Sequence, residues 1–580
     1  MDRLTHRAAT LLASGTFALV VAVLLAISAR LNGGRIVFVA DDPYIHMAMA
    51  KNLVRHGEWG VTGGSFSSTS SSPLWTCMLA AAYLGLGVGE AAPLLLNVLF
   101  GILAVVVVGR MLEREGVSPR WTLAVSLVVV TIVPLPTIAL CGMEHTLQIV
   151  LALAFAMAAA EAAAGEPEAS TGAPFRLALL LAVLLVGARY EGLFLVGVAA
   201  ALLALKRRFT PAVAVVAAGT APAAAYGAVS LAHGWYALPN SVLLKGHAPA
   251  AWSASALGGY AASGLERLVR SPELAALALA AVVILVVGRR RRGADEDRHR
   301  AVLLIFLGAL AAHAVLAATN YRYEAYLVAL GIVACAAGAR PLVAGRGGAA
   351  HGRARRSVTV AAAVAVVVVA VPLAARGARA TAITVRASRN IYEQQVQMGL
   401  FLRRFHPGGA VAVNDIGAVS YFADVRLLDL WGLASLDVAR ARRGVGLSAA
   451  VVDRLAAADD VRVAVLYEEW YAGVLPRRWV RAGTWRIPDN VVCGGDTVTF
   501  FATSPEARDG LVQALREFSP ELPAEVVASP GIAARAETHA ALEEAAGCLR
   551  ARRGGRQLEN RSATPTTVTS VPTTARAVGR

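Results

Sequence analysis

The chain has 580 residues, of which 57% are hydrophobic and only 16% are charged. Soluble proteins carry about 25% charged residues, so the composition excludes an ordinary soluble protein and indicates a polytopic membrane protein. The net charge of +16 comes from short basic clusters between apolar segments. Such clusters report membrane topology, and they argue against a nucleic-acid-binding surface.

The first apolar segment, residues 9–28, is long enough to cross a bilayer. Arg3 and Arg7 precede it, as in a signal peptide, but the apolar run is long for a signal and many apolar segments follow. We therefore expect an uncleaved signal anchor.

An acidic pair, Asp41-Asp42, follows in the long loop 29–90. Placing carboxylates beside an apolar surface costs free energy, so such carboxylates are usually paired with cations or have a function. A structural alternative is that they cap the next helix, because Asp is a good N-cap and Pro43 suits a first turn. Asp42 directly precedes that proline, so we expect Asp42 to be the cap and Asp41 to be the chemical group.

An amphipathic helix is predicted after the acidic pair. Ile45, Met49 and Leu53 share one helical face, which favours a helix lying along the membrane surface. The hydroxyl-rich run 65–72 follows, either as a plain linker or as a loop that binds sugar hydroxyls. The apolar segment 73–88 is short for a span and is predicted to be re-entrant or interfacial.

Further apolar segments predict the remaining spans. They lie near 91–109, 121–140, 145–163, 211–231, 272–288, 301–318, 324–338 and 357–374, with 177–205 read as two short helices that meet at Arg189-Tyr190-Glu191. Placing the basic clusters inside gives about eleven spans, with the N-terminus inside and the C-terminal region outside.

This topology gathers the unusual polar residues on one outer surface. Among them, Arg189, Lys245 and Arg322 are predicted to hold an anionic lipid phosphate. The alternatives are snorkelling to the interface and, for Arg189, neutralisation by Glu191. A divalent metal on Asp42, His46, Glu144 and His145 is a weak alternative, because their spacing is not diagnostic. No nucleotide-binding motif occurs, so no nucleotide cofactor is expected.

Residues 375–550 change character. Short β-like runs at 410–413, 425–430, 461–467 and 497–503 alternate with helical stretches, which predicts a small α/β domain. Cys493 and Cys548 could pair if this domain is extracytoplasmic. Residues 551–580 are rich in Arg, Thr, Ser and Pro and are predicted to form a disordered tail.

Several segments resemble the GT-C superfamily of integral membrane glycosyltransferases, and most closely the branch of the mycobacterial terminal arabinofuranosyltransferase. The resemblance rests on these segments in family order: ADDPYIHMAMAKNLVRHGEWG, SSPLWTCMLA, Gly142-Met143-Glu144, Arg189-Tyr190-Glu191-Gly192, Leu238-Pro239-Asn240-Ser241 with Lys245, and NDIGAVSYFADVRLLDLWGL. Tyr190 replaces the family's usual proline, and the loop 65–72 lacks its acidic-polar character. We therefore do not carry the sugar, arabinose, over to this chain.

The resemblance implies a GT-C-like transmembrane domain at 1–374 and transfer of a sugar from a polyprenyl-phosphate donor to a cell-envelope glycan or lipid on the outside of a bacterial plasma membrane. It implies base catalysis by Asp41 or Asp42, with acceptor or sugar contacts from His46, Trp75, Glu144, His145, Tyr190, Glu191 and Asn240. A transporter or lipid flippase is the alternative, although the chain shows no clear internal repeat.

Overall fold

A computed structural model describes residues 4–165, 172–245, 254–289, 293–317, 320–344, 353–444 and 446–531, with the backbone alone at 254–257, 340–344 and 353–369. Residues Met1–Pro530 form one compact unit. The predicted tail 551–580 and Cys548 of the proposed cysteine pair lie outside the described residues.

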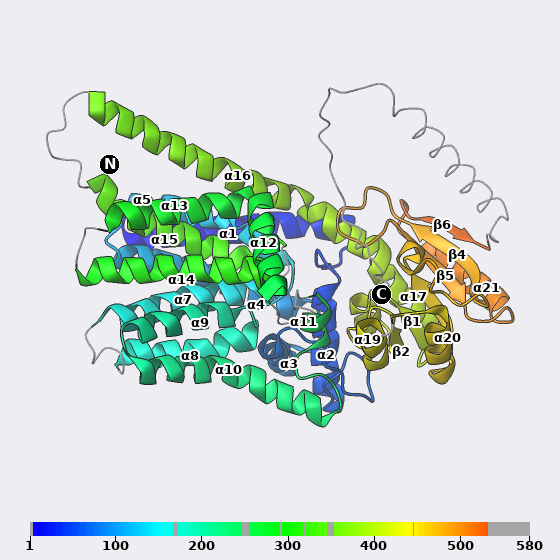
Figure 1. Cartoon of the computed structure of the whole chain (residues 1–580). Coiled ribbons are helices and arrows are strands. Elements are labelled where there is room, and N and C mark those ends of the chain that lie inside the picture. Colours follow the sequence, from blue (N-terminus) through cyan, green and yellow to red (C-terminus); the bar gives the residue numbers. More distant parts are fainter. Residues whose placement is uncertain are drawn as a thin grey trace, which may run out of the picture. The chain divides into compact units, whose positions relative to one another are not determined.

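In the described residues, sixteen α-helices lie between residues 6 and 391, most of them at the predicted apolar segments. They are α1 (His6–Leu31), α2 (Asp42–His56), α3 (Pro73–Leu86), α4 (Ala91–Arg114), α5 (Pro119–Ile132), α6 (Leu135–Leu140), α7 (His145–Ala164), α8 (Ala173–Ala188), α9 (Gly192–Leu205), α10 (Phe209–Ala232), α11 (Asn240–Lys245), α12 (Ala254–Arg270), α13 (Pro272–Gly288), α14 (Ala294–Leu316), α15 (Ala325–Ala344) and α16 (Arg353–Ile391). In Figure 1 helices α7, α9, α14 and α15 run side by side, with α2, α3 and α11 near one end of them.

Among the described residues, five helices are long and apolar enough to cross a membrane: α1, α4, α7, α10 and α14. Helices α12 and α13, bent by 99° where they meet, would form a sixth span. The chain is therefore a multi-pass membrane protein, as predicted. Helices α5, α8, α9 and the described part of α15 are shorter apolar helices, and the predicted span 357–374 lies mostly outside the fully described residues, so the expected total of about eleven stays a prediction.

The predicted single span 121–140 is wrong. The segment is broken into α5, which ends at Ile132, and the short α6, which begins at Leu135. Pro134 and Pro136 account for the break, since proline lacks the N–H that would continue the helical hydrogen bonds. Helix α3, in the segment expected not to cross, has 14 residues and packs against α2 and α8.

The C-terminal part is a six-stranded mixed sheet in the order β2-β1-β3-β5-β4-β6. Its strands are β1 (Ala410–Val413), β2 (Arg426–Asp429), β3 (Val461–Leu466), β4 (Val480–Arg486), β5 (Thr497–Ala502) and β6 (Val527–Pro530). Strands β1, β2 and β3 are parallel, and the other pairings are antiparallel. All four predicted strands occur, while β4 and β6 were not predicted. The predicted fold class, an α-helical membrane protein with a C-terminal α/β domain, is confirmed.

Helices cover both faces of this sheet. Helices α17 (Gln397–Phe405), α18 (Gly417–Phe422) and α21 (Arg508–Phe518) bury apolar residues on one face, whereas α19 (Leu436–Arg443) and α20 (Ala449–Ala458) pack on the other. Burial on both faces explains why β1 reads as the uninterrupted apolar run AVAV. Helix α16 leads without a break from the bundle toward α17, so the expected domain boundary at 374 falls inside a helix.

Candidate active site

The two acids of the pair have different partners. Asp41 lies just before α2 and Asp42 is its first residue, so the expectation that Asp42 is the cap is wrong. Asp41 makes no capping bond to α2. Its carboxylate instead accepts hydrogen bonds from the backbone N–H groups of Gly417 (2.7 Å) and Ala418 (2.8 Å) at the start of α18.

Asp41 therefore helps to join the loop 29–90 to the C-terminal domain. At the other end of α18, the Lys51 ammonium donates to the carbonyls of Ser420 (3.2 Å) and Tyr421 (2.9 Å). Acceptor oxygens at the start of a helix satisfy N–H groups that have no partner within the helix, and a cation at its end matches the helix dipole. Burial and the negative charge of Asp415 raise the pKa of Asp41 to about 8, although its backbone hydrogen bonds act in the opposite direction.

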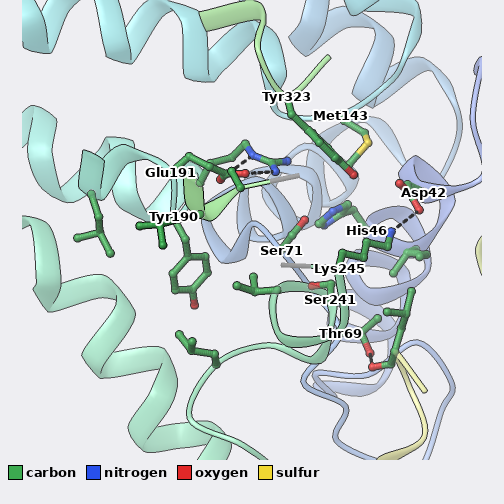
Figure 2. A pocket seen from close by; sticks show the side chains of 18 of the residues that line it. Asp42, His46, Thr69, Ser71, Met143, Tyr190, Glu191, Ser241, Lys245 and Tyr323 are labelled. Carbon is green, nitrogen blue, oxygen red and sulfur yellow. Dashed lines mark hydrogen bonds and ion pairs between the residues drawn. The ribbon is translucent and has the colours of Figure 1, made fainter. Parts of the chain in front are cut away.

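Asp42 faces a cavity of about 260 Å³. Figure 2 shows its carboxylate toward Lys245, with His46 beside them. The polar lining comes from Asp42, His46, Thr69, Ser71, Arg189, Tyr190, Glu191, Ser241, Lys245 and Tyr323, and the apolar lining from Ile45, Met143, Leu193, Phe194, Leu238, Val242, Leu316, Ala317 and Leu433. The cavity thus offers both charged and apolar groups to a ligand.

Two cations share the Asp42 carboxylate. Lys245 Nζ lies 3.3 Å from Oδ1, and the Arg322 guanidinium donates to Oδ2. The trio of Asp42, Lys245 and Arg322 carries a net charge of +1. Burial alone would raise the pKa of Asp42, but the charges of Lys245 and Arg322 outweigh burial and hold that pKa below its usual range.

Arg189 is held by acids. Its guanidinium donates to Glu144 Oε1 (2.6 Å) and to both carboxylate oxygens of Glu191 (2.6 and 3.1 Å), and it lies 4.8 Å from the ring centroid of Tyr323. Glu144 is fully buried, and its other oxygen lies 3.9 Å from His46 Nε2. Glu191 therefore neutralises Arg189, as one of the alternatives from the sequence proposed. Glu144 is a second acid paired with the same guanidinium.

We predict that Arg189→Ala destabilises the protein by about 3–5 kcal/mol, because it leaves buried Glu144 without its cation. Thermal unfolding in detergent, followed by tryptophan fluorescence, measures the loss. The double variant Arg189→Ala/Glu144→Gln should recover part of it, since no uncompensated charge then remains at Glu144. An unchanged unfolding temperature in the single variant would contradict the prediction.

The structure brings together only some of the residues proposed from the sequence. Arg322 and Glu144 touch cavity-lining residues without lining the cavity themselves. Trp75 and His145 are fully buried, and Asn240 donates to the carbonyl of Gly432 (2.8 Å). Neither these three nor Asp41 is among the lining residues.

Sequence reasoning missed several lining residues. Tyr323 directly follows Arg322 in the sequence, and its ring lies beneath both Arg189 and Arg322. Leu433 comes from the C-terminal domain, and its carbonyl accepts a hydrogen bond from Thr69 Oγ1 (3.1 Å). The hydroxyl-rich composition of residues 65–72 did not predict that Thr69 would bind the C-terminal domain.

Within the described part of the chain, no group of three or more His, Cys, Asp or Glu side chains is placed to hold a metal ion. The weak metal alternative on Asp42, His46, Glu144 and His145 is therefore not supported. Asp42 and Glu144 are occupied by cations, and His46 Nδ1 contacts Thr76 Oγ1 at 3.0 Å. Cys493 is a free thiol within hydrogen-bond reach of Gln395.

Comparisons with known proteins give one family match and two similar structures. A family described as a domain of unknown function (DUF8728) matches residues 389–501. ArnT from Cupriavidus metallidurans bound to undecaprenyl phosphate is 16% identical, with a TM-score of 0.46 over 85% of this chain and 99% of that one. Its apo state is 15% identical, with a TM-score of 0.47 over 86% and 99%. No curated protein matches the sequence. Neither structure is described as an arabinofuranosyltransferase, so that finer resemblance stays a prediction.

Proposed function

We propose that this protein is a membrane glycosyltransferase that transfers a sugar from a polyprenyl-phosphate donor to a cell-envelope glycan or glycolipid. One observation carries the proposal: a carboxylate shared by two cations faces a cavity that is also lined by nine apolar residues. The order of the family-like segments along the chain supports it. We place the reaction on the extracytoplasmic side of a bacterial plasma membrane. The reason is that the topology with the basic clusters inside puts the loop 29–90, which carries Asp42, outside.

The charges of the cavity suit a lipid-linked phosphate. The Asp42–Lys245–Arg322 trio has one positive charge in excess, and the phosphodiester of a polyprenyl-phosphate sugar carries one negative charge. Leu193, Phe194 and Leu316, at the ends of α9 and α14, give the first units of a lipid tail an apolar surface. When the bond from the sugar to the phosphate breaks, negative charge grows on the phosphate, which Lys245 and Arg322 would stabilise.

Asp42 is the better candidate for the general base, because it faces the cavity while Asp41 binds the start of α18. In the reaction, the acceptor oxygen bonds to the anomeric carbon, the polyprenyl phosphate leaves, and Asp42 takes the hydroxyl proton. A carboxylate paired with two cations is a weak base. A donor phosphate that shares Lys245 and Arg322 would raise the pKa of Asp42 and so strengthen it.

A transfer assay tests the proposal. The purified protein, in nanodiscs, is given a panel of polyprenyl-phosphate sugars and size-fractionated envelope glycans. We expect one donor to yield a glycosylated acceptor and an equal amount of polyprenyl phosphate. Movement of labelled lipid across sealed vesicles without any glycosylated product would favour the transporter or flippase alternative instead.

A further inference from the structure

An aromatic cluster, defined here as Trp431, Tyr467 and Trp470, lies on the C-terminal domain and has no role in the steps above. The ring centroids of Trp431 and Trp470 are 5.4 Å apart, and those of Tyr467 and Trp470 are 5.0 Å apart. Trp470 is 44% exposed, which is unusual for so large an apolar ring. Trp431 is partly exposed and Tyr467 is buried, so Trp470 is the ring that the cluster presents at the surface.

The cluster lies where ligands bind in open α/β sheets. Strand β1 lies between β2 and β3 and is parallel to both, while the chain passes from β1 to β2 and then crosses to β3 on the other side. Ligands bind outside the carboxyl ends of the strands at such a reversal. Trp431 follows the carboxyl end of β2, and Tyr467 and Trp470 follow that of β3.

Hydrogen bonds fix the base of the cluster. The Tyr467 hydroxyl lies 2.8 Å from Asp415 Oδ2, which also accepts from Gln395 Nε2 at 2.9 Å. Trp470 packs on Gly494, where an added Cβ would lie 2.3 Å from its indole. The rings are therefore held in place before any ligand arrives, which lowers the entropy cost of binding.

One rigid loop, Asp429–Ala434, connects the aromatic cluster to the cavity. The Asp429 carboxylate accepts from the backbone N–H groups of Trp431 (2.8 Å) and Ala434 (2.7 Å). Gly432 has a φ of +91°, and its carbonyl accepts from Asn240. Within this loop Trp431 belongs to the cluster, whereas Leu433 lines the cavity beside Asp42.

The chemistry of the cluster suits a carbohydrate. The negative face of an indole attracts the weakly positive C–H groups of a sugar ring. Polar groups lie close by to meet the hydroxyls: the Arg442 guanidinium lies 4.7 Å from the Trp431 ring centroid, and the partly exposed Glu468 pairs with Arg481. A purely apolar partner would remove water from these charged groups without replacing its hydrogen bonds, which costs free energy.

We propose that the aromatic cluster is a subsite for the acceptor glycan, holding sugar units beyond the one that reacts at Asp42. This proposal rests on the proposed function, since it assigns the acceptor to a place beside the same cavity. Long acceptors would then bind more tightly than short ones, while the chemical step would be the same for both.

The test uses fluorescently labelled oligosaccharides of increasing length, released from the envelope polysaccharide of the source cell. We expect Trp470→Ala to raise KM for long acceptors by about tenfold or more, with kcat and the KM of the shortest acceptor nearly unchanged. Trp470→Phe, which keeps a ring, should restore much of the loss. Trp121→Ala, at another exposed tryptophan, is the matched control. Equal KM values for long acceptors in wild type and Trp470→Ala would overturn the subsite.

A binding measurement separates this proposal from the proposed function. Fluorescence anisotropy of the labelled long oligosaccharide reports binding without any transfer. One outcome is a wild type that binds the oligosaccharide but transfers no sugar, with binding lost in Trp470→Ala. That outcome would support the subsite and contradict the glycosyltransferase proposal. The other outcome is a wild type that transfers sugar but binds the oligosaccharide no more tightly than Trp470→Ala does. That outcome would support the glycosyltransferase proposal and contradict the subsite.

Discussion

Asp42→Asn is expected to lower the rate of sugar transfer by about 10²–10⁴-fold, the range that a positioned general base contributes. The amide cannot take the proton of the acceptor hydroxyl, although it keeps the size of the carboxylate. Steady-state transfer with saturating donor measures the loss. Because Asp42 lies at the surface of the cavity, the fold should survive the change.

Asp41→Asn is the matched control, because the two acids are neighbours and the substitution is the same. An asparagine oxygen at position 41 can still accept one of the two backbone hydrogen bonds from α18. We therefore expect a much smaller loss of rate than for Asp42→Asn, together with a lower unfolding temperature. The opposite ranking, with Asp41→Asn nearly inactive and Asp42→Asn active, would make Asp41 the base.

The difference between the two acids could not be predicted from the sequence. The partners of Asp41 lie 376 and 377 residues further along the chain, at the start of a six-residue helix. Local capping rules gave the wrong assignment, because they consider only the helix that follows the acids. The long-range contact with α18 determines which carboxylate is left facing the cavity.

Other parts of the site were predictable, because hydropathy and charge act locally. Hydropathy predicted the positions of most apolar helices, and the topology put Lys245 and Arg322 on the same surface as Asp42, although it did not predict that both cations pair with that carboxylate. The break between α5 and α6 was also readable from Pro134 and Pro136, and it was missed because length alone was used. Leu433 was not predictable, since it comes from the C-terminal sheet-containing part, far along the chain from the other lining residues.

Lys245→Ala and Arg322→Ala are each expected to weaken the binding of polyprenyl phosphate by about 10–100-fold. A hydrogen bond to a charged group contributes about 1.5–3 kcal/mol, and each substitution removes one cation from the trio. Isothermal titration of the short-chain product into protein in nanodiscs measures the affinity. Lys206→Ala removes an equal charge from an exposed position outside the cavity and serves as the control.

The same titration with Asp42→Asn should give a change of opposite sign. In the unliganded site the carboxylate competes with phosphate for both cations, so its neutralisation leaves Lys245 and Arg322 free for the ligand. We expect about tenfold tighter binding of polyprenyl phosphate by a variant that has nearly lost transfer. A merely structural role for the trio would weaken binding in all three variants alike. Only competition between the carboxylate and the phosphate for the same two cations would make the Asp42 variant bind more tightly than wild type.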